Sequence, residues 1–180
     1  MDKPWYRRWF GQTPPPEVET TRAKADQGDP DAQFALGLRY ATGKSADPDF
    51  VQAAHWYRLA AAQYHSLAQF NLGVMYSKGQ GVPKDEDEAA SWFEKAARLG
   101  DPGAQFNLGL RYQRASLRGL PAAAPESKIE AYKWYHLAAS QGYKDSAAAC
   151  DTLTLNMTSA EVADGNLRAA AFLTVKPAHA

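Results

Sequence analysis

The 180-residue sequence has one cysteine, no net charge and no long apolar run. The lone Cys150 excludes a disulfide framework within the chain. Twenty basic residues balance twenty acidic ones, so nothing global favours nucleic acid, whose binding proteins present a basic face to phosphate. No stretch approaches the roughly 20 apolar residues that cross a bilayer, and the first ten residues lack the apolar segment of a secretory signal. These absences predict a cytoplasmic protein, or a periplasmic one if an export signal preceded the sequence.

The motifs that carry catalysis and metal binding are also missing. Neither an HExxH nor a CxxC spacing occurs, and neither Ser-x-x-Lys nor Gly-x-Ser-x-Gly offers a nucleophile. The turn at residues 79–81 lacks the glycine and lysine of a phosphate-binding loop. His55 and His136 flank tryptophans and are expected to be partly buried. The acidic run at 85–88 favours a solvated helix start over a metal site. We therefore expect no catalytic, cofactor-binding or metal-binding residue, and no enzyme.

An internal repeat with a period of 36 residues dominates the sequence. The block Ala-Gln-Phe-(Ala/Asn)-Leu-Gly occurs at 32–37, 68–73 and 104–109. Residues 30–65 and 66–101 are identical at thirteen of their 36 aligned positions. Repeats of this length each form one helix-turn-helix unit that buries its apolar face only by stacking on its neighbours. The predicted fold class is therefore all-α, a solenoid of stacked helix pairs.

Each repeat divides into a first helix, called A, and a second helix, called B. Asp49 and Asp85 are suited to cap the start of a B helix, and Gly100 and Gly142 to follow its end. Trp134 lies six residues beyond the period, which places an insertion loop at 115–125. The A helices are expected at about 31–42, 67–78 and 103–114, the B helices at about 49–63, 85–99 and 126–141, and the flanking helices at 17–27, 145–156 and 158–173.

Domain boundaries follow from this reading. An N-terminal aromatic and basic segment with a proline-rich spacer covers 1–16. The solenoid covers 17–156, with full repeats at about 31–64, 67–100 and 103–142 and partial capping repeats on either side. A capping helix at 157–174 and a tail at 175–180 complete the chain.

Large apolar and small residues share one face of the predicted helices. On a helical wheel the repeated alanine, leucine, glycine and tyrosine of helix A fall on one side, which predicts burial. Glycine within a helix costs about 1 kcal/mol relative to alanine, so its recurrence suggests a close approach by another helix. Cys150 takes the position of the repeated leucine and is expected to be a small buried hydrophobe. The predicted repeat core comprises Leu36, Gly37, Tyr40, Trp56, Leu72, Gly73, Tyr76, Trp92, Leu108, Gly109, Tyr112 and Trp134.

At these residues the chain resembles the Sel-1-like repeat (SLR) family, relatives of the tetratricopeptide repeats (TPR). The family pattern is Ala-x-x-x-Leu-Gly-x-x-Tyr, a Gly-x-Gly-Val-x-x-Asp turn, then Ala-x-x-Trp-x-x-x-Ala-Ala, and residues 68–100 match it nearly throughout. The first repeat departs at Ser45 and Ala46, and the third through its insertion. The resemblance covers about residues 28–147. It implies a right-handed superhelix and a role as adaptor, scaffold or regulator of protein assemblies, most often in bacteria.

The resemblance also implies a concave groove lined by the A helices, where a protein or peptide partner would bind. On the wheel, Phe34 and Leu38 lie opposite the core face. One phenylalanine per repeat would form an apolar ladder, the asparagines would bond a peptide backbone, and the arginines would pair with acidic side chains. Alternatively, the phenylalanines fill the space between repeats. The predicted partner-binding residues are Phe34, Leu38, Arg39, Phe70, Asn71, Val74, Phe106, Asn107, Leu110 and Arg111.

Other functions remain open at this stage. Cysteine-rich members of the family are linked with β-lactam binding, so a hydrolase of β-lactam or cell-wall type is an alternative, although this chain lacks their paired cysteines. A subunit that assembles end to end is another, and the exposed end helices would allow a homodimer. The aromatic and basic segment around Trp5, Tyr6, Trp9 and Phe10 is expected to be a docked or disordered end, with membrane-interface or partner binding as alternatives.

Overall fold

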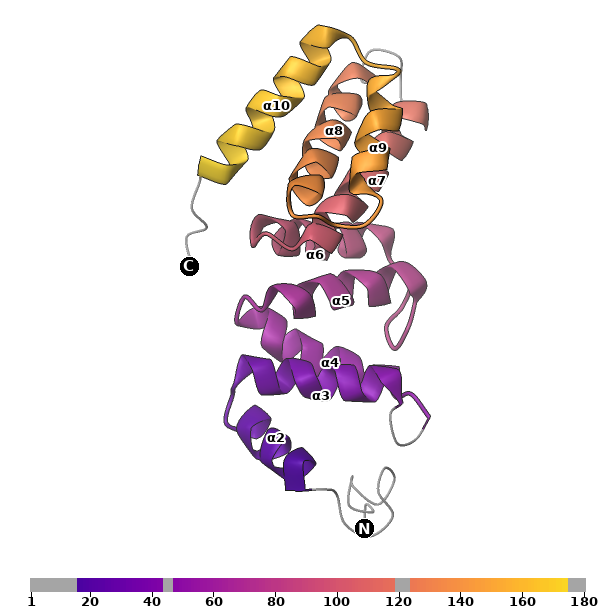
Figure 1. The fold of residues 1–180 in the computed structure, drawn as a ribbon. Coiled ribbons are helices and arrows are strands. Elements are labelled where there is room, and N and C mark those ends of the chain that lie inside the picture. The colour runs from indigo at the N-terminus through magenta and orange to yellow at the C-terminus, as the bar shows by residue number, and fades with distance from the viewer. Residues whose placement is uncertain (1–15, 44–46, 119–123, 175–180) are drawn as a thin grey trace. The chain divides into compact units, whose positions relative to one another are not determined.

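The computed structural model describes residues 16–43, 47–118 and 124–174. All of its regular elements in this part of the chain are helices (Figure 1). The N-terminal aromatic segment, the tail at 175–180 and parts of two turns lie outside the described residues. The helices are α2 (Pro16–Asp26), α3 (Pro30–Thr42), α4 (Phe50–Ala62), α5 (Ser66–Lys78), α6 (Glu86–Arg98), α7 (Pro102–Arg118), α8 (Ala124–Ser140), α9 (Ser146–Thr154) and α10 (Ser159–Thr174).

Local chemistry defines the helix ends. The carboxylates of Asp29 and Asp49 accept the amide protons of Ala32 and Gln52, which satisfies donors that have no partner within the helix. Gly43 and Gly79 end α3 and α5 in the left-handed conformation that glycine adopts at little cost. The A helices of the three repeats are therefore α3, α5 and α7, and the B helices are α4, α6 and α8.

The described residues group into two compact units, with the boundary between Trp92 and Phe93 inside α6. In the first unit α2, α3, α4 and α5 pack in sequence (Figure 1). Its core contains Leu36, Trp56, Tyr57 and Leu72, surrounded by fully buried alanines. Small residues at these positions allow the helices to approach closely, as the repeat pattern predicts.

The second unit is centred on α8, which packs against α7, α9 and α10. Tyr135 is fully buried, and Tyr132 and Cys150 lie in the same cluster. Helix α10 is held on α8 by ion pairs as well as by packing. The guanidinium of Arg168 binds Glu126, and it also lies 2.9 Å from both Glu130 and Asp164.

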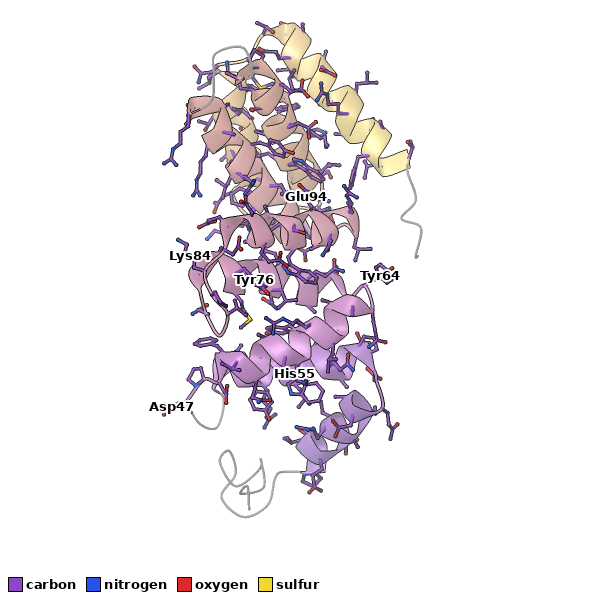
Figure 2. All side chains as sticks on the ribbon, turned by 180° about the vertical axis from the view of Figure 1, so that it is seen from behind. Asp47, His55, Tyr64, Tyr76, Lys84 and Glu94 are labelled. Carbon is purple, nitrogen blue, oxygen red and sulfur yellow. The ribbon has the colours of Figure 1, made fainter. Side chains whose placement is uncertain are left out.

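The third repeat differs from the expectation at its insertion. Helix α7 continues to Arg118 instead of ending near residue 114, and α8 already begins at Ala124. The reason is that residues 114–118 are good helix formers with no glycine or proline among them. The expectation for His55 and His136 was also wrong, since both side chains are exposed, as Figure 2 shows for His55.

Candidate functional site

An open hollow of about 300 Å³ lies along the exposed side of α3 in the first unit. Ala35, Leu38, Arg39 and Thr42 line it, and because they recur every three or four residues they occupy one side of the helix. Leu38 is 44% exposed, so part of its apolar side chain is accessible from solvent. Two of the residues predicted to bind a partner, Leu38 and Arg39, therefore border this hollow.

The predicted phenylalanine positions are half-buried and packed against other rings. Phe34 lies between Tyr57 and His65, with ring centroids 5.7 and 4.6 Å away. Phe106 repeats the arrangement with Tyr135 and Tyr143, at 5.4 and 5.6 Å. Each phenylalanine thus joins its A helix to the B helix and the turn that follow it. Only the remaining exposed part of each ring is accessible to a ligand.

The other predicted partner residues of α5 and α7 are also half-buried. The side-chain amide of Asn107 donates a hydrogen bond to the Gly103 carbonyl oxygen one turn earlier, at 2.8 Å. The residues of intermediate exposure are Phe70, Asn71, Val74, Phe106, Asn107 and Leu110.

The exposed end of α7 carries arginines that the sequence analysis did not assign to the site. Arg111 was predicted to bind a partner and is exposed. Arg114 and Arg118 follow at one-turn spacing and are exposed as well. Arg118 was missed because residues 115–125 were expected to form a loop, whereas Arg114 lay in the expected helix at 103–114 but was not assigned to the site. The helix formers between positions 114 and 118 were the signal that could have found them.

The predicted core positions of the repeats lie largely within the two units. Leu36, Leu72 and Leu108 have almost no exposed surface, and Tyr40, Trp56 and Trp134 are buried. Tyr76, Trp92 and Tyr112 are half-buried. Gly37 and Gly109 face the rings of Tyr57 and Tyr135, with no room for a side chain.

A buried glutamine in each A helix forms a joint between successive helices that sequence analysis had overlooked. The side-chain amides of Gln33, Gln69 and Gln105 donate to the carbonyl oxygens of Ala25, Ala61 and Ala97, each eight residues earlier. Those carbonyls lie at or near the end of the preceding helix, where each also accepts the backbone N–H of the residue three positions later. The repeated Ala-Gln-Phe block carried the signal, but polar residues are normally assigned to the surface.

The glutamine joint is completed by a second glutamine in two of the repeats. The Gln63 amide donates to the Gln33 side-chain oxygen at 2.9 Å, and Gln141 donates to Gln105 at the same distance. Position 99, the equivalent in the middle repeat, is leucine. Consistently, the Gln69 side-chain oxygen is buried and accepts no hydrogen bond within the described part of the chain.

The tyrosine and cysteine side chains with strongly raised pKa values are buried structural residues. Burial raises the pKa of the Tyr57 and Tyr135 phenols to about 12 each. Burial, with a smaller contribution from Asp151, raises the pKa of the Cys150 thiol to about 11, which opposes a role as nucleophile at neutral pH. Among the described residues no group of histidine, cysteine, aspartate and glutamate is arranged to hold a metal ion.

No helix in the described residues is both long enough and apolar enough to span a bilayer. The exposed side chains are polar or scattered apolar residues. Tyr64 at the α4–α5 turn is one of the scattered aromatics (Figure 2).

These features define the class: an all-α protein built from repeated antiparallel helix pairs joined by buried small residues and glutamines. The chain belongs to the Sel1 repeat family, whose model matches it at residues 30–65, 66–101 and 102–143. The predicted family and its SLR-type, TPR-like helical-solenoid fold are therefore confirmed. Sel1 repeats are generally protein-interaction modules and are typically non-catalytic. Membership of the family therefore suggests that this chain has a protein partner, without identifying it.

Solved structures of two proteins are similar to this chain. One is c5321, a protective antigen present in uropathogenic Escherichia coli strains that displays an SLR fold, with 41% identity and a TM-score of 0.62 over 72% of this chain. The chain spans only 26% of that protein's length. The other is a Sel1 repeat protein from Oxalobacter formigenes, with 34% identity and a TM-score of 0.62, covering 76% of this chain and 98% of that one. The search of curated proteins found no match.

Proposed function

We propose that the protein is an adaptor that binds a segment of another protein on the exposed side of its A helices. The hollow along α3 carries this proposal, because it combines an exposed leucine with the guanidinium group of Arg39. An apolar side chain of a partner would be desolvated against Leu38, while the Arg39 guanidinium would donate hydrogen bonds to a carboxylate or carbonyl oxygen of the partner.

Helix α3, which lines this hollow, is packed against its neighbours on the opposite side, which suits recognition of a partner without large rearrangement. Leu36 and Gly37 on the opposite side of α3 are buried, and Phe34 is packed between two rings. Binding would therefore order few side chains of the adaptor itself, which lowers the entropic cost of association. A scaffold of this kind supports an interaction role without any catalytic group.

The test is affinity capture from a lysate of the source organism, with captured proteins identified by mass spectrometry. Leu38→Glu is compared with wild type and with Leu59→Glu, a control at a residue of similar exposure, 38%, on the B helix α4. Circular dichroism checks that all three proteins remain helical. We expect a partner that wild type and the control retain and that Leu38→Glu loses. Equal capture by all three folded proteins would reject this surface.

A further inference from the structure

Three arginines form one exposed strip along the second half of α7. Arg111, Arg114 and Arg118 lie within about 60° of one another around the helix, since successive residues are separated by 100°. All three side chains are exposed. We call this group the arginine strip.

An apolar strip lies next to the arginine strip on the same helix. Leu110 is half-buried and Leu117 is 81% exposed. Around the helix axis, both lie within about 60° of Arg114. Guanidinium groups and leucines therefore lie side by side on one accessible side of α7. The described structure places no other element over Leu117.

The A helices as a group have a strong bias toward basic residues. In α3, α5 and α7 the only acidic residue is Asp31, in the first turn of α3 and 3.3 Å from the His65 ring. The chain as a whole has no net charge. The excess of positive charge on these helices is therefore offset by acidic residues elsewhere in the sequence. The basic residues of the three helices are Arg39, Lys78, Arg111, Arg114 and Arg118.

We infer that the side of α7 that carries Arg111, Arg114 and Arg118 binds an acidic segment of a partner protein, with leucines or aromatic residues among its carboxylates. The inference rests on the proposed adaptor function and adds the chemistry of the partner. Guanidinium groups bind carboxylates through paired, charge-assisted hydrogen bonds, so three in a row select for Asp and Glu. Leu110 and Leu117 provide apolar contacts for the leucines or aromatic residues of the partner segment. A purely acidic segment would not use these contacts.

A protein segment fits this surface better than a nucleic acid does. Proteins that bind single-stranded nucleic acid combine basic residues with aromatic rings on which bases stack. The residues beside the arginine strip are aliphatic, and the nearby Phe106 ring is already packed between Tyr135 and Tyr143. The strip thus provides charge for an acidic ligand without a stacking platform.

The experiment measures fluorescence anisotropy of labelled probes against the full chain. The probes are a short-peptide pool built from Glu, Leu, Phe and Ser, a second pool in which Lys replaces Glu, and oligouridylate RNA. The test variant is Arg111→Gln/Arg114→Gln/Arg118→Gln. The control, Lys24→Gln/Lys84→Gln/Arg98→Gln, removes the same number of positive charges at exposed positions in α2, a turn and α6.

We expect wild type and control to bind the acidic pool alike, and the test variant to bind it about tenfold more weakly, since each exposed ion pair contributes a few tenths to one kcal/mol. Added salt should weaken the wild-type interaction. The inference is overturned if the test variant binds the acidic pool as tightly as wild type, if the basic pool binds equally well, or if neither pool binds. RNA binding that exceeds acidic-peptide binding and is lost in the test variant also overturns it, in favour of nucleic acid.

Capture from the lysate separates this inference from the adaptor function. A partner lost by Leu38→Glu but kept by the arginine variant would leave the adaptor function standing and reject the acidic-segment inference. A captured partner that only the arginine variant loses, through a segment mapped as acidic, would support it. Circular dichroism ensures that each variant is folded.

Discussion

A β-carbon on Gly37 would lie 2.5 Å from Cδ1 of Tyr57, so the tyrosine ring occupies the space that any other residue would need. Gly109 and Tyr135 show the same relationship at the same distance in the second unit. Helix A and helix B of a repeat thus contact through a glycine and the flat face of a ring. The burial that this contact requires is also what raises the pKa of both phenols.

Replacing Gly37 with alanine is expected to destabilise the protein despite the better helix propensity of alanine. Alanine gains about 1 kcal/mol of propensity, whereas forcing a methyl group against a fixed ring costs about 1–3 kcal/mol. Urea unfolding should show a net loss of up to about 2 kcal/mol. Gly37→Ala/Tyr57→Ala should lose much less than the sum of its two single variants, because the clash is gone. Additive losses would show that the ring does not cause the effect.

The glutamine joint predicts that Gln105→Leu is destabilising although it buries a more apolar side chain. Gln105 is 1% exposed, and the change removes both of its side-chain hydrogen bonds, the one to the Ala97 carbonyl oxygen and the one from the Gln141 amide. A loss of about 1–3 kcal/mol in the free energy of unfolding is expected. Gln52→Leu, at an exposed position of α4, should change stability little. A variant as stable as wild type would mean that the joint makes no net contribution.

The ion pair between Arg168 of α10 and Glu126 of α8 is expected to hold α10 more weakly in acid. A hydrogen bond and the charge of Arg168 hold the pKa of Glu126 below its ordinary 4.5. A carboxyl group whose pKa is lower in the folded than in the unfolded chain stabilises the fold at pH values above its unfolded-state pKa. That stabilisation is lost as the pH falls through the folded-state pKa. Because Glu126 is largely exposed, the effect is at most about 1 kcal/mol.

Hydrogen exchange of the α10 amides tests this contact directly. Arg168→Gln should speed their exchange at pH 7, and the difference from wild type should shrink in acid as Glu126 is protonated. The exposed Arg98→Gln serves as the control. Equal protection in wild type and Arg168→Gln at pH 7 would show that packing alone holds α10.

The Cys150 thiol is expected to react slowly in the folded protein. Its pKa rises from 9.0 to about 11, so at pH 8 the thiolate fraction is about a hundredfold lower than in the unfolded chain. Absorbance with a disulfide reagent such as DTNB should show at least this difference in rate between buffer and urea. Similar rates would indicate that the α8–α9 cluster opens readily.

Much of the fold could be predicted because its signals are local. The period of the leucine, glycine and tryptophan residues defined the helix pairs, and Gly37 marked a close approach before its contact with Tyr57 was known. The contacts of Phe34 could not be predicted in the same way. They depend on His65, which follows a full B helix, and ring stacking between separate elements has no sequence period.

The extent of α7 shows where sequence reasoning reached its limit. The six-residue insertion was recognised, but glycine and prolines at 119–125 suggested a loop throughout. The helix formers up to Arg118 outweighed this expectation, and Arg118 of the exposed strip was therefore assigned to a loop. The role of the repeated glutamine could not be predicted for another reason. Its acceptor is a backbone carbonyl oxygen, which every residue has, so no particular residue type marks the acceptor in the sequence.

The eight-residue separation between each buried glutamine and its carbonyl acceptor has a consequence for how such a protein grows. Both halves of the joint are encoded in one short stretch of sequence. A duplication of one period that leaves this stretch intact therefore copies a complete connection and requires no compensating change elsewhere. Tandem duplication can thus lengthen the array without other changes in sequence. Each new copy carries the glutamine and the carbonyl acceptor, so their hydrogen bond can form when the new pair of helices folds.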